Sequence, residues 1–376
     1  MSKPVILTGI RSNGELTLGN YLGAILPLVE LQKKHAGEYQ VNMFVPDLHS
    51  FTTPVEHGEL YQNTLDNLKV FAAAGLDINN DDTFIYRQSF ISAHSELTWI
   101  LDCFIGMGEL ERMTQYKSKA RQLYSENAEH YNKELAGEAN YAEMKAKQLK
   151  VMDDITYHIS AGLFNYPALM AADILLYGAQ YIPVGEDQRQ HIELTRDVAI
   201  RMNNKFGDLF VVPEEWNKQI EFANRTAGVR IRSLRNPEKK MSKSVEDPAG
   251  TILLSDKPDE AAKKVASATT DNEGSINYDF EKQPGVSNLL QISALLADRP
   301  VQDVASEWEG KNSYGDLKDH VAEQVKSFLI DLQAKYANVD QHRVLTKLEQ
   351  DEKAMRDVAS GTLLRVQKAV GLRTNA

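Results

Sequence analysis

Residues 15–32, ELTLGNYLGAILPLVELQ, follow the short apolar run PVILTGI at residues 4–10 and place Gly19 and Asn20 where an apolar helix should begin. A strand, a loop and then a helix form the repeating unit of doubly wound α/β sheets, whose ligands bind beyond the carboxyl ends of the strands. The Thr17 hydroxyl and the Asn20 amide could donate to phosphate oxygens, and Gly19 could leave room for a flat ring. The alternative is a simple turn in which Asn20 only caps the helix.

The rest of the chain repeats this alternation of short apolar strands and longer helical patterns. The predicted strands cover residues 5–8, 41–45, 83–86, 181–184 and 229–234. After about residue 250 only amphipathic helical patterns follow. We therefore predict a Rossmann-like α/β domain with a doubly wound parallel sheet over residues 1–250 and a C-terminal helical domain over residues 251–376. Residues 121–157 are polar and rich in Glu and Lys, which predicts an exposed helical insertion.

Composition limits the classes of protein that are possible. The 376 residues include 42% hydrophobic residues, and no apolar run reaches the roughly 18 residues of a membrane span. The N-terminus does not resemble a signal peptide, so we expect a cytoplasmic protein that does not associate with membranes. Cys103 is the single cysteine, which excludes an internal disulfide. His94 and His191 have no partners at metal-ligand spacing, so no metal site is predicted. The net charge of −11 argues against a general polyanion binder but allows a local basic patch.

A second stretch, KKMSKS at residues 239–244, favours phosphate chemistry. Its lysines are interleaved with hydroxyl groups, which suits a polyphosphate leaving group whose developing charge needs positive partners. The usual alternative for such a run is a solvated charged surface. The chain lacks the glycine-rich phosphate loop that ends in Lys-Ser or Lys-Thr, so phosphate binding would have to be built in another way.

Two short motifs in this order resemble the signatures of class I aminoacyl-tRNA synthetases: TLGN at residues 17–20 and KMSKS at residues 240–244. Further stretches at residues 108–120, 165–177, 182–197 and 285–290 resemble the bacterial-type tryptophanyl-tRNA synthetase family. The resemblance implies a catalytic domain and a helical anticodon-binding region, assembled as a homodimer. It also implies the substrates L-tryptophan, ATP with Mg²⁺ bound through its phosphates, and tRNA(Trp). The expected reaction forms tryptophanyl-adenylate and then transfers the aminoacyl group to the tRNA.

The resemblance also assigns roles on the nucleotide side of the site. Thr17 and Asn20 would contact phosphates, and Gly19 would lie under the adenine. Lys119, Lys240 and Lys243 would bind the triphosphate. The other residues expected near ATP are Gly185, Asp187, Met241, Ser242 and Arg11, the last replacing a glutamine of the family. Arg11 could hold the tryptophan carboxylate or the α-phosphate, or turn outward to an acid on a loop.

The tryptophan pocket can be argued from helical spacing. Pro167 fits the first turn of a helix with Asn165 or Tyr166 near its cap, and one face would then carry Tyr166, Met170, Asp173 and Tyr177. A carboxylate on such a face needs a donor, and the indole N–H of tryptophan can only donate. By resemblance, Asp173 accepts this N–H, Tyr166 and Gln188 hold the amino group, and His49 lines the pocket. The alternative is that Asp173 pairs with an Arg or Lys in a structural role.

Two other functions compete with this interpretation. A tyrosyl-tRNA synthetase would share the fold and both signatures, but its pocket should recognise a phenol hydroxyl. An inactive synthetase-like protein could use the nucleotide site for regulation. The sequence around Asp173 and the stretch GEDQ at residues 185–188 favour the tryptophan enzyme.

Overall fold

Four parallel strands form the sheet in the part of the chain that the structure describes. The structure, a computed structural model, describes residues 3–9, 14–35, 37–52, 57–119, 160–223, 230–241 and 247–374. Within these ranges the strands are β1 (Val5–Gly9), β2 (Gln40–Val45), β3 (Thr83–Arg87) and β4 (Ala179–Tyr181), in the order β3-β2-β1-β4. All three pairings are parallel. Arg11, Ser242, Lys243 and the insertion expected over 121–157 lie outside the described residues.

Helices cover both faces of the sheet. One face is covered by α1 (Leu18–Asn20), η1 (Tyr21–Ile25), α2 (Leu26–His35) and α4 (Leu60–Ala73), and the other by α5 (Ala93–Asp102), α9 (Ala161–Leu175) and α10 (Arg189–Phe206). Successive strand residues point to opposite faces, so Met43 joins the first apolar cluster and Phe44 the second. The predicted doubly wound α/β fold is confirmed.

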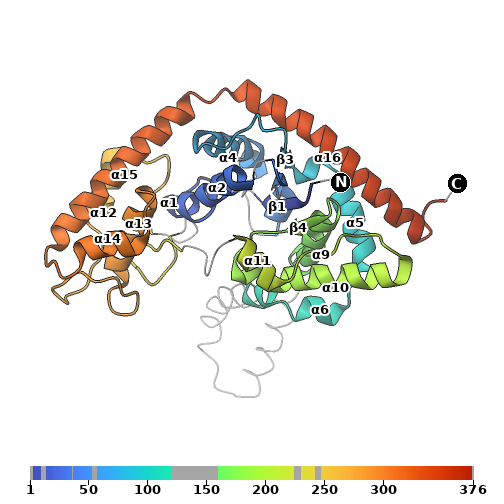
Figure 1. The fold of residues 1–376 in the computed structure, drawn as a ribbon, viewed down its shortest axis with the longest axis horizontal. Helices are drawn as coiled ribbons and strands as arrows, with labels where there is room; N and C mark the ends of the chain where they lie inside the picture. The colour runs from blue at the N-terminus through green and yellow to red at the C-terminus, as the bar shows by residue number, and fades with distance from the viewer. Residues whose placement is uncertain are drawn as a thin grey trace, which may run out of the picture.

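Helices dominate the chain after the sheet, as predicted. They are α12 (Pro258–Ala266), α13 (Pro284–Leu296), α14 (Val301–Trp308), α15 (Tyr314–Ala337) and α16 (Gln341–Ala369). Shorter elements in the first part are α3 (Asp47–Ser50), η2 (His57–Glu59), η3 (Gln88–Phe90), α6 (Met107–Glu111), η4 (Glu186–Gln188) and α11 (Trp216–Ala223). Figure 1 shows α15 and α16 forming an arch over the sheet region. In the described ranges, no helix is both long and apolar enough to cross a membrane.

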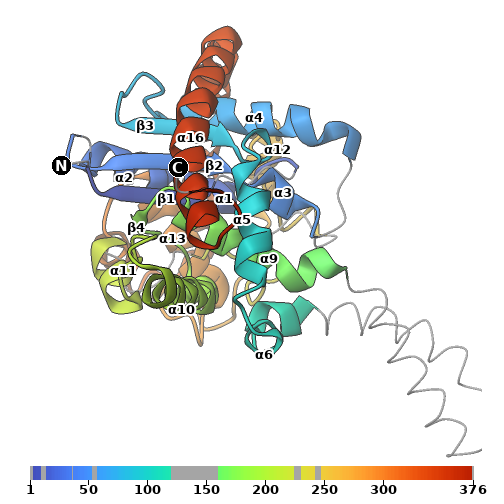
Figure 2. The same ribbon diagram turned by 90° about the vertical axis from the view of Figure 1, so that its right-hand side faces the viewer.

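The last helix returns to the sheet and covers its outer edge. Figure 2 shows α16 passing in front of β3 and beside α5, and it contacts both elements. Among the described strands β3 pairs with β2 alone, so the N–H groups at its other edge need acceptors from outside the sheet. Asp351 accepts the N–H of Ile85 at 2.7 Å, and Glu352 accepts that of Arg87 at 3.3 Å. Two neighbouring carboxylates on α16 thus take the place of a fifth strand.

One apolar cluster crosses residue 250, where the sequence predicts a domain boundary. It joins Leu18 and Leu22, which cover the sheet, to Leu289 and Leu329 on α13 and α15. The helices beyond residue 250 therefore share a hydrophobic core with the α/β part.

Two predicted elements differ from the structure. The strand expected over 181–184 ends at Tyr181. The strand expected over 229–234 does not join the sheet within the described residues 230–234, where Arg232 forms an isolated antiparallel bridge with Lys240. The backbone groups of this stretch are occupied elsewhere, because Asn288 on α13 bonds both the N–H and the carbonyl of Arg232.

The start of α9 also differs from its prediction. Ser160 caps the helix by accepting the N–H of Leu163 at 3.1 Å, so Pro167 lies inside the helix rather than in its first turn. The misplaced start does not change the predicted face, because Tyr166, Met170 and Asp173 all border the same cavity.

Candidate functional site

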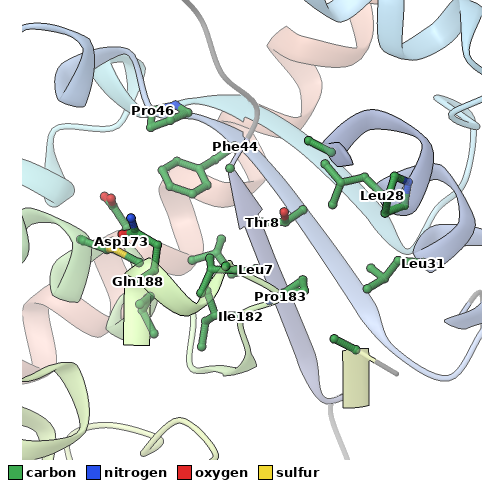
Figure 3. A pocket seen from close by; sticks show the side chains of 18 of the residues that line it. Leu7, Thr8, Leu28, Leu31, Phe44, Pro46, Asp173, Ile182, Pro183 and Gln188 are labelled. Carbon is green, nitrogen blue, oxygen red and sulfur yellow. The ribbon is translucent and has the colours of Figure 1, made fainter. Parts of the chain in front are cut away.

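A cavity of about 790 Å³ opens at the carboxyl ends of β1 and β2 and continues between α2 and α9. Figure 3 shows Asp173 and Gln188 on one side of it, Leu28 and Leu31 of α2 on the other, and Thr8 between them. Seven of the site residues predicted from sequence line this cavity: His49, Lys119, Tyr166, Met170, Asp173, Gly185 and Gln188.

Asp173 is the most deeply buried charged group of this cavity, with 1% of its side chain exposed. Its Oδ1 atom accepts hydrogen bonds from His94 Nδ1 at 2.6 Å and from Gln88 Nε2 at 2.7 Å. Its Oδ2 atom accepts one from His49 Nε2 at 2.9 Å. Among the described residues, no Arg or Lys forms an ion pair with Asp173, so the structural alternative of such a pair finds no support here.

These donors determine the charge of Asp173. Burial alone would raise the pKa of the carboxyl group, but the hydrogen bonds from His49 and His94 outweigh it and lower the pKa to about 2. The cavity wall therefore carries an ionised carboxylate at neutral pH. Such a group can only accept hydrogen bonds, which suits a ligand with an N–H and no acceptor at that point.

The opposite end of the α9 face carries polar groups that suit an amino acid's head group. The Tyr166 hydroxyl lies 2.8 Å from His191 Nε2, and Lys119 Nζ lies 5.4 Å from the centroid of the Tyr166 ring. Gln188 Nε2 donates to Asp187 Oδ2 at 2.9 Å, on the exposed side of the site. A side chain at Gly185 would collide with Asp187 Oδ1, so the glycine lets the Asp187 carboxylate fold over the backbone.

The first signature motif forms the start of the helical run that continues through η1 into α2. Thr17 is the N-cap, and Asn20 completes a capping box: Asn20 Oδ1 accepts from the Thr17 N–H and hydroxyl, each at 3.0 Å, and the Asn20 N–H donates to Thr17 Oγ1 at 3.1 Å. The Thr17 hydroxyl hydrogen is therefore used within the cap. Asn20 Nδ2 makes no hydrogen bond to another described residue, which leaves it as the donor of this motif.

The second signature motif packs directly on the first. A Cβ atom built on Gly19 would lie 3.4 Å from the Cβ of Met241 and 3.5 Å from that of Ile231. Met241 is buried and Lys240 is exposed. Gly19 thus lies in the contact between the two motifs, where it leaves room for Met241 and Ile231 to approach the helix. Thr17, Gly19, Asn20, Asp187, Lys240 and Met241 all lie outside the cavity lining.

Gln88 and His94 hold Asp173, but the sequence did not identify them as site residues. Gln88 follows β3 directly, and the ends of neighbouring parallel strands meet at one edge of the sheet, so its position was an available signal. His94 was considered only as a metal ligand. Within the described ranges, no cluster of three or more His, Cys, Asp or Glu side chains could bind a metal ion.

Comparisons with known proteins found similar sequences and similar structures. A family described as tRNA synthetases class I (W and Y) matches residues 1–330. A tryptophan–tRNA ligase from Caldanaerobacter subterraneus is 40% identical over 367 residues, which cover 98% of each chain. The solved tryptophanyl-tRNA synthetase from Mycoplasma pneumoniae is 34% identical with a TM-score of 0.76, covering 100% of this chain and 99% of that one. The synthetase from Campylobacter jejuni, solved with ADP and tryptophan, is 28% identical with a TM-score of 0.70, covering 98% and 99%.

Proposed function

We propose a mechanism for this chain, which belongs to the class I tRNA synthetases for tryptophan and tyrosine and has the function of a tryptophan–tRNA ligase. The family and the activity implied by the two signature motifs are thereby confirmed. The full-length matches to tryptophan–tRNA ligases favour tryptophan over the tyrosine alternative, and they favour an ATP-dependent enzyme over an inactive regulator.

One observation carries the assignment of the amino-acid pocket: the buried carboxylate of Asp173 faces a cavity that it shares with Tyr166, Met170 and His49. We place the indole ring against Met170, with its N–H on Asp173. Tyr166 and Gln188 line the same cavity, and we place the ammonium group against their side chains. The substrate would then point its carboxylate toward Lys119 and the ends of β1 and β2.

Catalysis in this scheme depends on positioning and charge rather than on a protein nucleophile. The tryptophan carboxylate attacks the α-phosphate of ATP, and pyrophosphate leaves. Lys119 from the cavity wall, with Lys240 and Lys243 from the second signature motif, would stabilise the charge that grows on the leaving group. Asn20 Nδ2 is a further donor for a phosphate oxygen. The role of Arg11 follows from the sequence alone and stays a prediction.

Mg²⁺ would enter with ATP, held by the phosphate oxygens. When bound, it would neutralise part of the phosphate charge. Gly185 and Asp187 lie beside Gln188, where the ribose of ATP would adjoin the amino acid. Met241 and Ser242 would accompany Lys240 and Lys243 in the ATP-binding loop.

The second step transfers the aminoacyl group to a terminal ribose hydroxyl of tRNA(Trp). We propose that the helices after residue 250 recognise the anticodon region, while residues 1–250 carry out the chemistry. We also propose a cytoplasmic homodimer. A partner surface on α5 and α6 is supported by their exposed apolar side chains, since Trp99 of α5 is 72% exposed and Met107 of α6 is 65% exposed.

A pyrophosphate-exchange assay across the twenty amino acids tests the central assignment. We expect ATP-dependent exchange with tryptophan, weak exchange with tyrosine and negligible exchange with the others. Exchange that prefers tyrosine would contradict the pocket assignment. Exchange with no amino acid, from folded protein, would contradict the catalytic role.

A further inference from the structure

The two oxygens of the Asp173 carboxylate differ in how many donors they already serve. Oδ1 accepts from both Gln88 and His94, whereas His49 is the one donor to Oδ2 among the described residues. Each carboxylate oxygen offers about two acceptor positions. Oδ1 is therefore saturated by the protein, and Oδ2 retains one position for a ligand.

The donor from Gln88 has a fixed orientation. Gln88 has no exposed surface, and its Oε1 atom accepts the backbone N–H of Leu48 at 3.1 Å. Because Oε1 is held by an N–H donor, the amide nitrogen must be the atom that faces Asp173. Turning the amide over would place two acceptors, Oε1 and Oδ1, against each other.

The donor from His94 is held at both ends of its ring. Nδ1 lies on Asp173 Oδ1, so it carries the hydrogen of that bond, and Nε2 lies 2.8 Å from the hydroxyl of Tyr177. The ring has no exposed surface and stacks at 10° against Phe44, with 6.4 Å between the ring centroids. Neither rotation nor a flip of this ring keeps both hydrogen bonds.

We propose that Gln88 and His94 are positioning residues for tryptophan selection: they hold Oδ1 of Asp173, so that Oδ2 alone accepts the indole N–H, beside the bond from His49. This proposal rests on the proposed function and deepens it. Without the two donors, the carboxylate can rotate about its Cβ–Cγ bond and present either oxygen at changing angles. A hydrogen bond to the substrate N–H weakens when its direction is not maintained.

The test compares tryptophan with 3-(3-benzothienyl)alanine, in which sulfur replaces the indole N–H at nearly the same shape. Pyrophosphate exchange gives kcat and KM for both substrates in the wild type, Gln88→Met and His94→Leu. We expect each variant to reduce the preference for tryptophan by about tenfold or more, mainly through a higher KM for tryptophan, with the KM for ATP unchanged. His94→Asn restores a donor near the Nδ1 position and should keep most of the preference.

Gln32→Met is the matched control. Gln32 is also a buried glutamine whose amide serves as both donor and acceptor, to Asp77 and Thr83, but it lies away from the Asp173 cluster. This variant should lose stability without changing the preference between the two substrates. Thermal unfolding of every variant separates a folding defect from a change in the preference between the two substrates. If Gln88→Met does not fold, the comparison of His94→Leu with His94→Asn tests the proposal.

Three outcomes separate the proposal from the function on which it rests. A wild type that prefers tryptophan, with folded variants that keep the full preference, would overturn the positioning role. A crystal structure of the tryptophan complex with the indole nitrogen closer to Oδ1 than to Oδ2 would overturn it as well. A wild type that does not distinguish the two substrates would instead overturn the assignment of Asp173 to the indole.

Discussion

The guanidinium group of Arg87 holds the carboxylate of Glu352 through two hydrogen bonds, Nε to Oε1 at 2.6 Å and Nη2 to Oε2 at 3.0 Å, across 265 positions of sequence. Both side chains are at most 5% exposed. The pair fastens α16 to the residue that directly precedes Gln88. Through Arg87, the last helix is therefore linked to the residue next to Gln88, whose amide orients the Asp173 carboxylate.

Replacing Glu352 by Ala should lower the free energy of unfolding by about 3–5 kcal/mol, because Arg87 would remain buried without its counterion. Urea denaturation measures the loss. The double variant Arg87→Met, Glu352→Ala is the control, and it should recover a large part of the stability. Strictly additive losses in this double-mutant cycle would show that the two residues are not coupled.

Asp173→Ala should reduce the activation of tryptophan by about a hundredfold or more, because the indole N–H loses a charge-assisted hydrogen bond inside a shielded pocket. The wild type should reject phenylalanine by a factor on the order of 10⁴, since phenylalanine leaves the carboxylate without its ligand donor. The Asp173→Ala variant should show a smaller preference for tryptophan over phenylalanine. Equal losses for both substrates in pyrophosphate exchange would identify Asp173 as a structural acid.

Lys119→Met should slow adenylate formation by about a hundredfold while leaving the affinity for tryptophan nearly intact, because the ammonium group acts on charge that develops on the leaving pyrophosphate. Lys117→Met is a close control, since Lys117 is exposed and does not line the cavity. Single-turnover kinetics measure the step. An unchanged rate in Lys119→Met would remove this residue from the mechanism.

His191 should make the protein less stable as the pH falls from about 6.5 to 4. Burial lowers the pKa of His191 to about 4 in the folded state. Between these pH values, His191 is therefore protonated in the unfolded chain but neutral in the folded protein. The expected loss is roughly 2–3 kcal/mol. Urea denaturation across this range should show a flatter pH dependence in His191→Gln, which keeps a polar atom toward Tyr166. An identical slope in the variant would assign the effect to other groups.

Gly285→Ala should destabilise the protein strongly, by about 3 kcal/mol or more, because a Cβ atom there would collide with the backbone carbonyl of Thr269. Gly361→Ala is the matched helical control. Nothing lies within 4 Å of a Cβ atom built on Gly361, so this change should stabilise α16 by about 0.5–1 kcal/mol. Melting temperatures compare the two, and equal effects would contradict the close approach at Gly285.

The periodicity of the sequence predicted the elements whose stability comes from burial. The first three strands and the shared face of Tyr166, Met170 and Asp173 follow from apolar spacing, and the structure has them with boundaries shifted by a residue or so. The short fourth strand and the bridge at Arg232 were harder to predict. Asn288 bonds the backbone of Arg232 from 56 positions away, and Gln219 bonds the Gln180 carbonyl of β4 from 39 positions away. Local patterns do not show such contacts.

The sequence also predicted some residues of the site and missed others. Most residues expected to touch a substrate were named from the family resemblance, and Asp173 was also named because a carboxylate matches an indole N–H. Gln88 was missed because its role is to bond Asp173, 85 positions away, and one glutamine after a strand does not stand out in a sequence. The position of Gly19 under the adenine came from the family resemblance and stays a prediction, whereas its contact with Met241 was missed, because the sequence does not show that the two signature motifs pack together.

The carboxylates of Asp351 and Glu352 that occupy the edge of β3 have a consequence for synthesis on the ribosome. Asp351 and Glu352 follow Ile85 and Arg87 by 266 and 265 positions, so they leave the exit tunnel much later than β3 does. Until then, the N–H groups of Ile85 and Arg87 have no partner on that side, and an open strand edge can pair with another chain. We expect the nascent protein to need protection from aggregation until Glu352 has left the tunnel, and a chain that stops before residue 351 to keep this need permanently.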